Sequence, residues 1–193
     1  MPHEDFEVHG AHDHELEHAA EHGRADRFAG RIAVSTAILA TLGALMSFAG
    51  GDTQANAQIY KNEAAIKKTE ANDQWNYFES KGNKQNLAEV AATLTAQPDK
   101  VQFYQSEVER YKKQKAEIKE VADRLEAEYK EWNRRGEEQM HIHHRWALGV
   151  TAMQIAIALS AIAMLTRHDW LVYGVYAVAA IGLVFGGLAV AGI

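Results

Sequence analysis

The sequence predicts an all-α membrane protein with three transmembrane helices and a long antiparallel coiled-coil hairpin between the first and the second. Three apolar blocks without a charged residue predict the transmembrane helices, and a charged stretch with one central proline predicts the hairpin. The parts expected in chain order are an acidic histidine-rich tail (1–31), transmembrane helix 1 (32–51), an extramembrane hairpin that turns at Pro98 (52–145), transmembrane helix 2 (146–166) and transmembrane helix 3 (170–193).

Each apolar block is long enough to cross a bilayer. As a helix, residues 32–51 rise about 30 Å, which matches the hydrocarbon core of a membrane. Buried helices of a soluble protein are the alternative, but the rest of the chain offers too little amphipathic helix to cover three of them. Trp146, Trp170 and Tyr173 lie near block ends, as is typical of interfacial aromatic residues. Because only residues 167–169 separate the last two blocks, these two helices are expected to be antiparallel.

The hairpin is predicted from the position of Pro98 between two arms of nearly equal length. Proline ends a preceding helix and disfavours helix in the residue before it. Residues 53–97 and 99–145 are therefore expected to be helical and antiparallel, with Leu87 close to Val108 and Ile66 close to Tyr129.

Both arms carry residues at the seven-residue spacing of a coiled-coil seam. In the second arm, nine of ten seam residues are able to bury apolar surface: Val101, Tyr104, Val108, Tyr111, Lys115, Ile118, Ala122, Leu125, Tyr129 and Trp132. In the first arm the spacing is kept by Ile59, Ile66, Leu87 and Leu94 and broken by Asp73 and Ser80. We expect the first arm to present this stripe to the second, with a packing irregularity or kink near Gly82-Asn83.

The charge distribution excludes some classes of function. Residues 1–31 carry eight acidic and three basic side chains, and residues 52–145 carry seventeen acidic and sixteen basic ones. Neither region is a basic patch, so nucleic acid is not an expected partner. The chain has no cysteine, which excludes disulfides, thiolate metal sites and cysteine catalysis.

One segment of the first arm resembles a known family. Residues 71–81 read Ala-Asn-Asp-Gln-Trp-Asn-Tyr-Phe-Glu-Ser-Lys, in a helix that follows one span and precedes a paired-helix region and two closing spans. This arrangement resembles the bacterial membrane proteins of domain-of-unknown-function family 4337, over about residues 25–193. The resemblance implies the architecture and a bacterial inner membrane; it brings no activity and no catalytic residues.

The histidine-rich tail contains the strongest motif for chemistry. His14-Glu15-Leu16-Glu17-His18 matches H-E-x-x-H, in which two imidazoles on one helix face hold zinc. A catalytic zinc also needs a third ligand and a dry cavity, for which the tail has few apolar residues. His18 and His22 nearly repeat the motif, which indicates histidine-rich composition rather than a protease site. His14, His18 and His22 are nevertheless the candidate ligands for Zn or another divalent metal.

A second histidine group, His141, His143 and His144, lies at the base of the hairpin. It predicts either a metal-binding or proton-sensing site or, as we favour, a polar collar where the helix leaves the bilayer. No phosphate-binding loop, nucleophile elbow or distinct pair of carboxylates occurs in the sequence, so no catalytic residue and no cofactor are expected. The protein is expected not to be an enzyme.

The leading hypothesis is a non-enzymatic membrane scaffold or interaction protein, homo-oligomeric or part of a larger membrane complex. The coiled coil and the Gly182/Gly186 face of the third span are the expected partner surfaces, although the latter motif fits packing within one protomer equally well. Gln154, the polar residue of the second span, is expected to hydrogen-bond to another helix. The alternative is a metal-binding membrane protein that acts through the tail, which metal content with and without residues 1–25 would distinguish.

Topology is predicted from basic residues close to the spans. Arg24, Arg27 and Arg31 precede the first span, whereas no basic residue follows it until Lys61. Arg167 agrees with a cytoplasmic N-terminus, and Arg134, Arg135 and Arg145 before the second span oppose it. The N-terminus is therefore expected in the cytoplasm and the hairpin in the periplasm.

Overall fold

The computed structural model contains three α-helices: α1 (Ala11–Leu94), α2 (Pro98–Thr166) and α3 (Asp169–Val190). It describes the backbone of residues 11–192 and the side chains of residues 27–192, and this part of the chain has no strand. Each helix contains a segment long and apolar enough to cross a membrane. The chain divides into a three-helix unit, with the residues up to Gly51 and from Ile142, and a hairpin unit, Asp52–His141.

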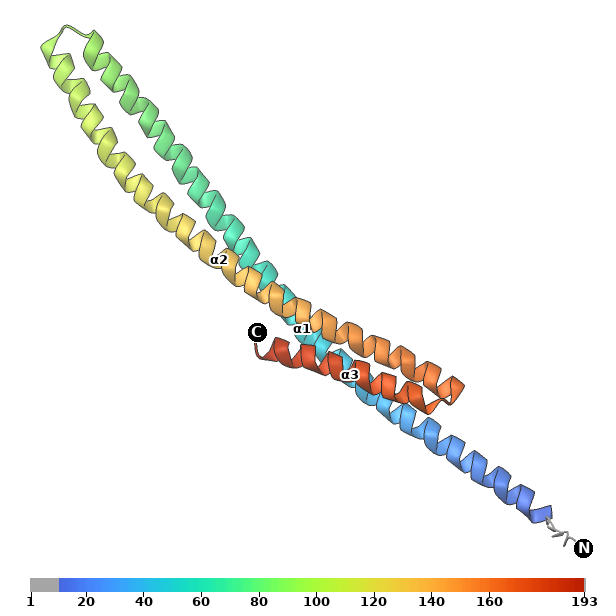
Figure 1. Cartoon of the computed structure of the whole chain (residues 1–193). Helices are drawn as coiled ribbons and strands as arrows, with labels where there is room; N and C mark the ends of the chain where they lie inside the picture. The colour runs from blue at the N-terminus through green and yellow to red at the C-terminus, as the bar shows by residue number, and fades with distance from the viewer. Residues whose placement is uncertain (1–10, 193) are drawn as a thin grey trace, which may run out of the picture. The chain divides into compact units, whose positions relative to one another are not determined.

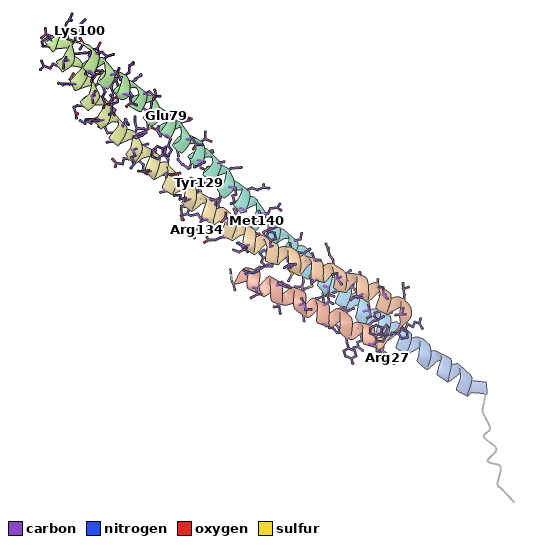
Figure 2. The ribbon with its side chains drawn as sticks, turned by 45° about the horizontal axis from the view of Figure 1, so that its top comes forward. Arg27, Glu79, Lys100, Tyr129, Arg134 and Met140 are labelled. Atoms are coloured by element: carbon purple, nitrogen blue, oxygen red, sulfur yellow. The ribbon has the colours of Figure 1, made fainter. Side chains whose placement is uncertain are left out.

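The turn between α1 and α2 lies at the end of the hairpin that Lys100 marks in Figure 2. Residues 95–97 are not helical, and Pro98 is the first residue of α2. Proline is favoured there because the first amide of a helix has no partner within the helix. The amides of Lys100 and Val101 donate to the carbonyl oxygen of Gln97 at 3.1 and 3.0 Å, and these bonds join the turn to the first turn of α2.

The two arms of the hairpin unit lie side by side and antiparallel (Figure 1). Lys67 Nζ lies 3.3 Å from the carboxylate of Glu128, and Lys68 Nζ lies 3.5 Å from that of Glu126. Nearer the turn, Lys115 Nζ donates to Gln85 Oε1 at 3.4 Å. These contacts have the antiparallel order that the sequence predicted. Exposed ion pairs contribute at most about 1 kcal/mol each, so the stability of the hairpin depends mainly on its seam.

The α2 side of that seam has the predicted residues. Val108, Ile118 and Ala122 are buried, and the other seven seam positions are half-buried. Lys115, the one charged member, holds its ammonium 4.8 Å from the centre of the Phe78 ring. An ammonium over an aromatic face is stabilised by the ring quadrupole, and the alkyl stem of a lysine packs well against apolar neighbours. A lysine is therefore compatible with this seam position.

The α1 side of the seam corrects the sequence analysis. Its most buried residues are Ala57, Ala64 and Ala71, with exposed fractions of 0%, 2% and 0%, and the Tyr60 ring on the same side lies 5.7 Å from that of Trp132. The four residues predicted to face α2 are instead exposed: Ile59 56%, Ile66 50%, Leu87 72% and Leu94 80%. The prediction was wrong because a seven-residue period shows that a stripe exists but not which stripe is buried. The large side chains of α2 fit best against small side chains on α1. The helix also continues through Gly82-Asn83 without a break.

The three-helix unit has a small apolar core, formed by Leu39, Met46, Met153, Ala156, Val175 and Ala179. Helix α3 packs closely on α2, because a Cβ atom added to Gly182 would lie 3.1 Å from the carbonyl oxygen of Gly149. Gly186 is buried beside the Met46 side chain. Of the two alternatives for the Gly182/Gly186 face, the structure therefore has packing within the chain.

Candidate functional site

The histidines chosen from the sequence do not form a described metal centre. His14, His18 and His22 belong to α1, but their side chains lie outside the described residues. Among residues 27–192, no group of three or more His, Cys, Asp or Glu side chains is placed to hold a metal ion. His141 belongs to the hairpin unit, and His143 and His144 belong to the three-helix unit.

His143 has a structural contact. Its Nδ1 atom lies 2.8 Å from the carbonyl oxygen of Gly50. A carbonyl only accepts hydrogen bonds, so Nδ1 carries the proton and donates it. A Cβ atom added to Gly50 would lie 3.0 Å from the Cβ atom of Trp146, so α1 and α2 approach closely at this point. The His143 side chain thus helps to join α1 and α2 at this point, and the polar collar stays a prediction.

A pocket of about 300 Å³ lies in the three-helix unit, between the start of the first apolar segment and the start of α3. Four of its lining residues are polar: Arg31, Asp169, Tyr173 and Tyr176. The hydroxyl of Tyr176 is hydrogen-bonded to that of Ser35 at 3.0 Å. Phe28, Ile32 and Val172 supply the apolar wall. A guanidinium, a carboxylate and two phenols therefore meet in one small concave site.

The two charged groups of this pocket make no direct contact with each other. Within the part of the chain that the structure describes, no ion pair or hydrogen bond joins Arg31 to Asp169. Asp169 is in the first turn of α3, where the helix dipole favours a negative charge. The sequence analysis used Arg31 only as a topology signal and missed the pocket. The signal in the sequence was that Arg31 and Asp169 each directly precede an apolar block, and with three antiparallel spans the first and third blocks begin on the same side.

A second candidate surface is the outer face of α1 in the hairpin unit, opposite the alanine seam. We call it the outer stripe and define it by two sets of exposed residues at seven-residue spacing. The first set is Ile59, Ile66, Asp73, Ser80, Leu87 and Leu94, and the second is Asn62, Thr69, Asn76, Asn83 and Val90. On the corresponding arm of α2, Phe103 is the only exposed large hydrophobic residue among those described. Five of the eleven residues of the outer stripe are therefore large aliphatic ones, in contrast to the single exposed large hydrophobic residue described on the α2 arm.

A shallow groove of about 370 Å³ lies on the outer stripe, lined by Asn76, Glu79, Ser80, Asn83, Lys84 and Leu87. These residues form two successive sets of four, 76/79/80/83 and 80/83/84/87. In a parallel coiled coil, four residues at these spacings form the hole that receives a side chain of the facing helix. The outer stripe thus has the seven-residue spacing of a coiled-coil seam, and a shallow groove lies along part of it.

The fold and these surfaces define an all-helical protein with a helical hairpin, three helices of membrane-spanning length and apolarity, and no described metal centre. Residues 28–192 match the family model described as "Domain of unknown function (DUF4337)". The chain belongs to this family, as its Trp75-to-Lys81 segment led us to expect. No curated protein and no solved structure matches it.

Proposed function

We propose that this protein is a non-enzymatic integral membrane scaffold that self-associates through the outer stripe of α1. The observation that carries the proposal is the second coiled-coil seam, exposed on α1 and directed away from α2. Its four Ile and Leu residues are between 50% and 80% exposed. Exposed apolar stripes of this regularity are typical of protein–protein interfaces.

A second copy of the chain is the partner that the stripe fits best. Its spacing is that of an α-helix in a coiled coil, and two copies of one helix match in period along their whole length. The seam positions and the positions beside them comprise about 20 residues per copy, close to the 20–30 residues that each side of a stable interface contributes.

The charges beside the stripe favour a parallel, in-register pair. Glu79 and Lys84 flank the groove and make no ion pair with each other or with another described residue. In a parallel coiled coil, residues five apart at these flanking positions meet across the interface, so Glu79 would lie beside Lys84 of the second copy. Asp73 opposes this pairing, because it would lie close to its own equivalent.

Gln154 gives independent support for a partner within the membrane. It lies near the middle of the second apolar segment and is exposed. It makes no hydrogen bond with a described residue, so the expected bond to another helix would be to a helix of another chain. An amide facing lipid without a partner is costly, and a polar residue of another copy would satisfy it.

The proposed location is the inner membrane of a bacterium. The apolar segments would cross the bilayer, with the N-terminus in the cytoplasm and the hairpin in the periplasm, as the basic residues near the first span indicate. An alkaline phosphatase fused to the C-terminus should then be active, and a green fluorescent protein exported there through the general secretory route should stay dark. The opposite pattern would place the hairpin in the cytoplasm.

Cysteine cross-linking tests self-association directly, since the chain has no native cysteine. In membranes, Ile66→Cys and Leu87→Cys should each form a disulfide-linked dimer, because equivalent residues of a parallel pair approach within the roughly 7 Å between Cα atoms that a disulfide allows. Glu117→Cys, exposed on α2, is the control and should remain monomeric. Cross-linking of Glu117→Cys as efficient as that of Ile66→Cys would contradict the proposal.

If a disulfide forms only when Ile66→Cys and Leu87→Cys chains are mixed, the two copies pair in an antiparallel orientation and the proposed parallel pair is wrong. If none of the three variants forms a disulfide and the protein still sediments with the membrane, the proposal of self-association is contradicted. The proposed membrane location is not affected by that result.

A further inference from the structure

In the proposed membrane arrangement, the pocket of the three-helix unit lies at the level of the lipid headgroups. Arg31 directly precedes the first apolar segment, and Asp169 is the first residue of α3. With three spans, these two positions are on the same membrane surface. The pocket that they line would therefore open at the level of the phosphate and headgroup region.

The cationic side of the pocket suits a phosphodiester. Arg31 provides a planar guanidinium, which forms paired, charge-assisted hydrogen bonds to phosphate oxygens. The Tyr176 phenol lies in the same wall and is oriented by its 3.0 Å hydrogen bond to Ser35. When the Ser35 hydroxyl is the donor in that bond, the phenolic proton of Tyr176 is free to donate to a phosphate oxygen.

The anionic side of the pocket suits an ammonium group. The carboxylate of Asp169 has no described cationic partner and accepts hydrogen bonds from an ammonium. The neighbouring Tyr173 ring is exposed and lines the same pocket, and aromatic faces attract cations. A volume of about 300 Å³ is at the lower end for ligand pockets, so the site suits one small headgroup.

We propose that this pocket binds the headgroup of a zwitterionic phospholipid with a primary ammonium, its phosphate on Arg31 and its ammonium on Asp169. The inference rests on the proposed membrane assignment. Both charges of such a headgroup would find a partner, and the apolar wall at Phe28 and Val172 would contact the adjoining glycerol and acyl carbons. An anionic phospholipid without an ammonium would satisfy Arg31 alone.

The test is lipid retention by the full chain, measured by native mass spectrometry after release from nanodiscs of equal parts phosphatidylethanolamine and phosphatidylglycerol. The unmodified chain should retain phosphatidylethanolamine preferentially. Arg31→Gln should reduce retention of both lipids about fivefold to tenfold, because both contain the phosphate. Asp169→Asn should abolish the preference and leave phosphatidylglycerol retention unchanged.

Arg167→Gln is the matched control, since it removes a positive charge from the α2–α3 turn without changing a residue that lines the pocket. Its retention should equal that of the unmodified chain. If Arg167→Gln reduces retention as much as Arg31→Gln, or if Asp169→Asn keeps the preference, the headgroup site is refuted. Each variant should keep the far-ultraviolet circular dichroism of the unmodified chain, and a variant that loses it is replaced by Arg31→Lys or Asp169→Ser.

Two further measurements separate the possible sources of failure. Soluble glycerophosphoethanolamine should not displace the retained lipid at equal concentration; displacement would assign the site to a free phosphodiester and overturn the lipid proposal. Resistance of the chain to alkaline carbonate extraction tests the membrane assignment separately. A chain that resists extraction but retains both lipids equally refutes the headgroup site alone, whereas an extractable chain refutes the membrane proposal on which it rests.

Discussion

The two arms of the hairpin place their large aliphatic side chains on different faces. The arm of α2 directs its seam residues, such as Val108 and Ile118, toward α1 and leaves a charged outer face. The arm of α1 buries Ala57, Ala64 and Ala71 and leaves Ile59, Ile66, Leu87 and Leu94 exposed. In this hairpin, the Ile and Leu residues of the α1 arm therefore lie on the face directed away from α2.

The comparison also separates two uses of one helix. The inner face of α1 fits α2, and its outer face repeats the same period with larger side chains. A helix with two seams is able to bind two neighbours at once. The following variants test whether the inner seam serves folding and the outer stripe serves association.

The largest effect is expected from the double variant Ile66→Ser/Leu87→Ser. In a dimer it removes four buried side chains, each worth about 1.5–3 kcal/mol, so association should fall by well over a factor of about 100. The free energy of unfolding of the hairpin should change little, because both residues are exposed in the single chain. Analytical ultracentrifugation in detergent measures the association.

Hydrogen exchange of the hairpin amides supplies the control for that double variant. Loss of protection in the seam, at a chain concentration where the unmodified protein is monomeric, would show that the outer stripe supports folding rather than association.

The second effect is expected from Ala64→Leu in the inner seam. Ala64 is 2% exposed, and extra carbons at a packed position cost about 1–3 kcal/mol. Hydrogen exchange should show faster opening of the hairpin. The neighbouring Ala65→Leu is the matched control, because Ala65 is exposed, and it should exchange like the unmodified chain. Equal protection in the two variants would mean that the alanine seam is not tightly packed.

A third variant, Asp73→Asn, determines the direction of pairing. Two like charges 4 Å apart repel by about 1 kcal/mol in water, so removal of the charge should tighten a parallel pair about fivefold. In an antiparallel pair centred on the stripe, Asp73 would lie near Ser80 of the other copy, and the variant should have little effect. Sedimentation at two salt concentrations measures the change, which should shrink as salt screens the repulsion.

The smallest effect concerns pH and the outer face of α2. Hydrogen bonds from Arg134 and Arg135 lower the pKa of Glu131 to about 2. Because the folded-state pKa lies below the ordinary value of 4.5, the group stabilises the fold above pH 4.5 and loses this contribution as the pH falls toward 2. The effect is small, since the pairs are exposed and lie within one helix.

Glu131→Gln isolates this group. The variant should flatten the acid-induced decrease in stability between pH 4.5 and 2, measured by circular dichroism of the hairpin, and leave stability at pH 7 almost unchanged. A large loss of stability at pH 7 would show that Glu131 has a structural role beyond these pairs.

The sequence by itself determined the element order and the antiparallel pairing of the arms. A single proline between two long helical arms leaves few other ways to arrange them, and the helix does restart at Pro98. The α2 seam was also predictable, because its large side chains recur every seven residues over five heptads.

Only the tertiary structure decided which face of α1 is buried, because the outcome depends on the volume of the side chains opposite and not on the period within one helix. It also decided that Gly182 and Gly186 pack inside the chain, since a small-residue motif fits either neighbour. The pocket at Arg31 and Asp169 likewise depends on the distance between two residues far apart in sequence, which no local pattern determines.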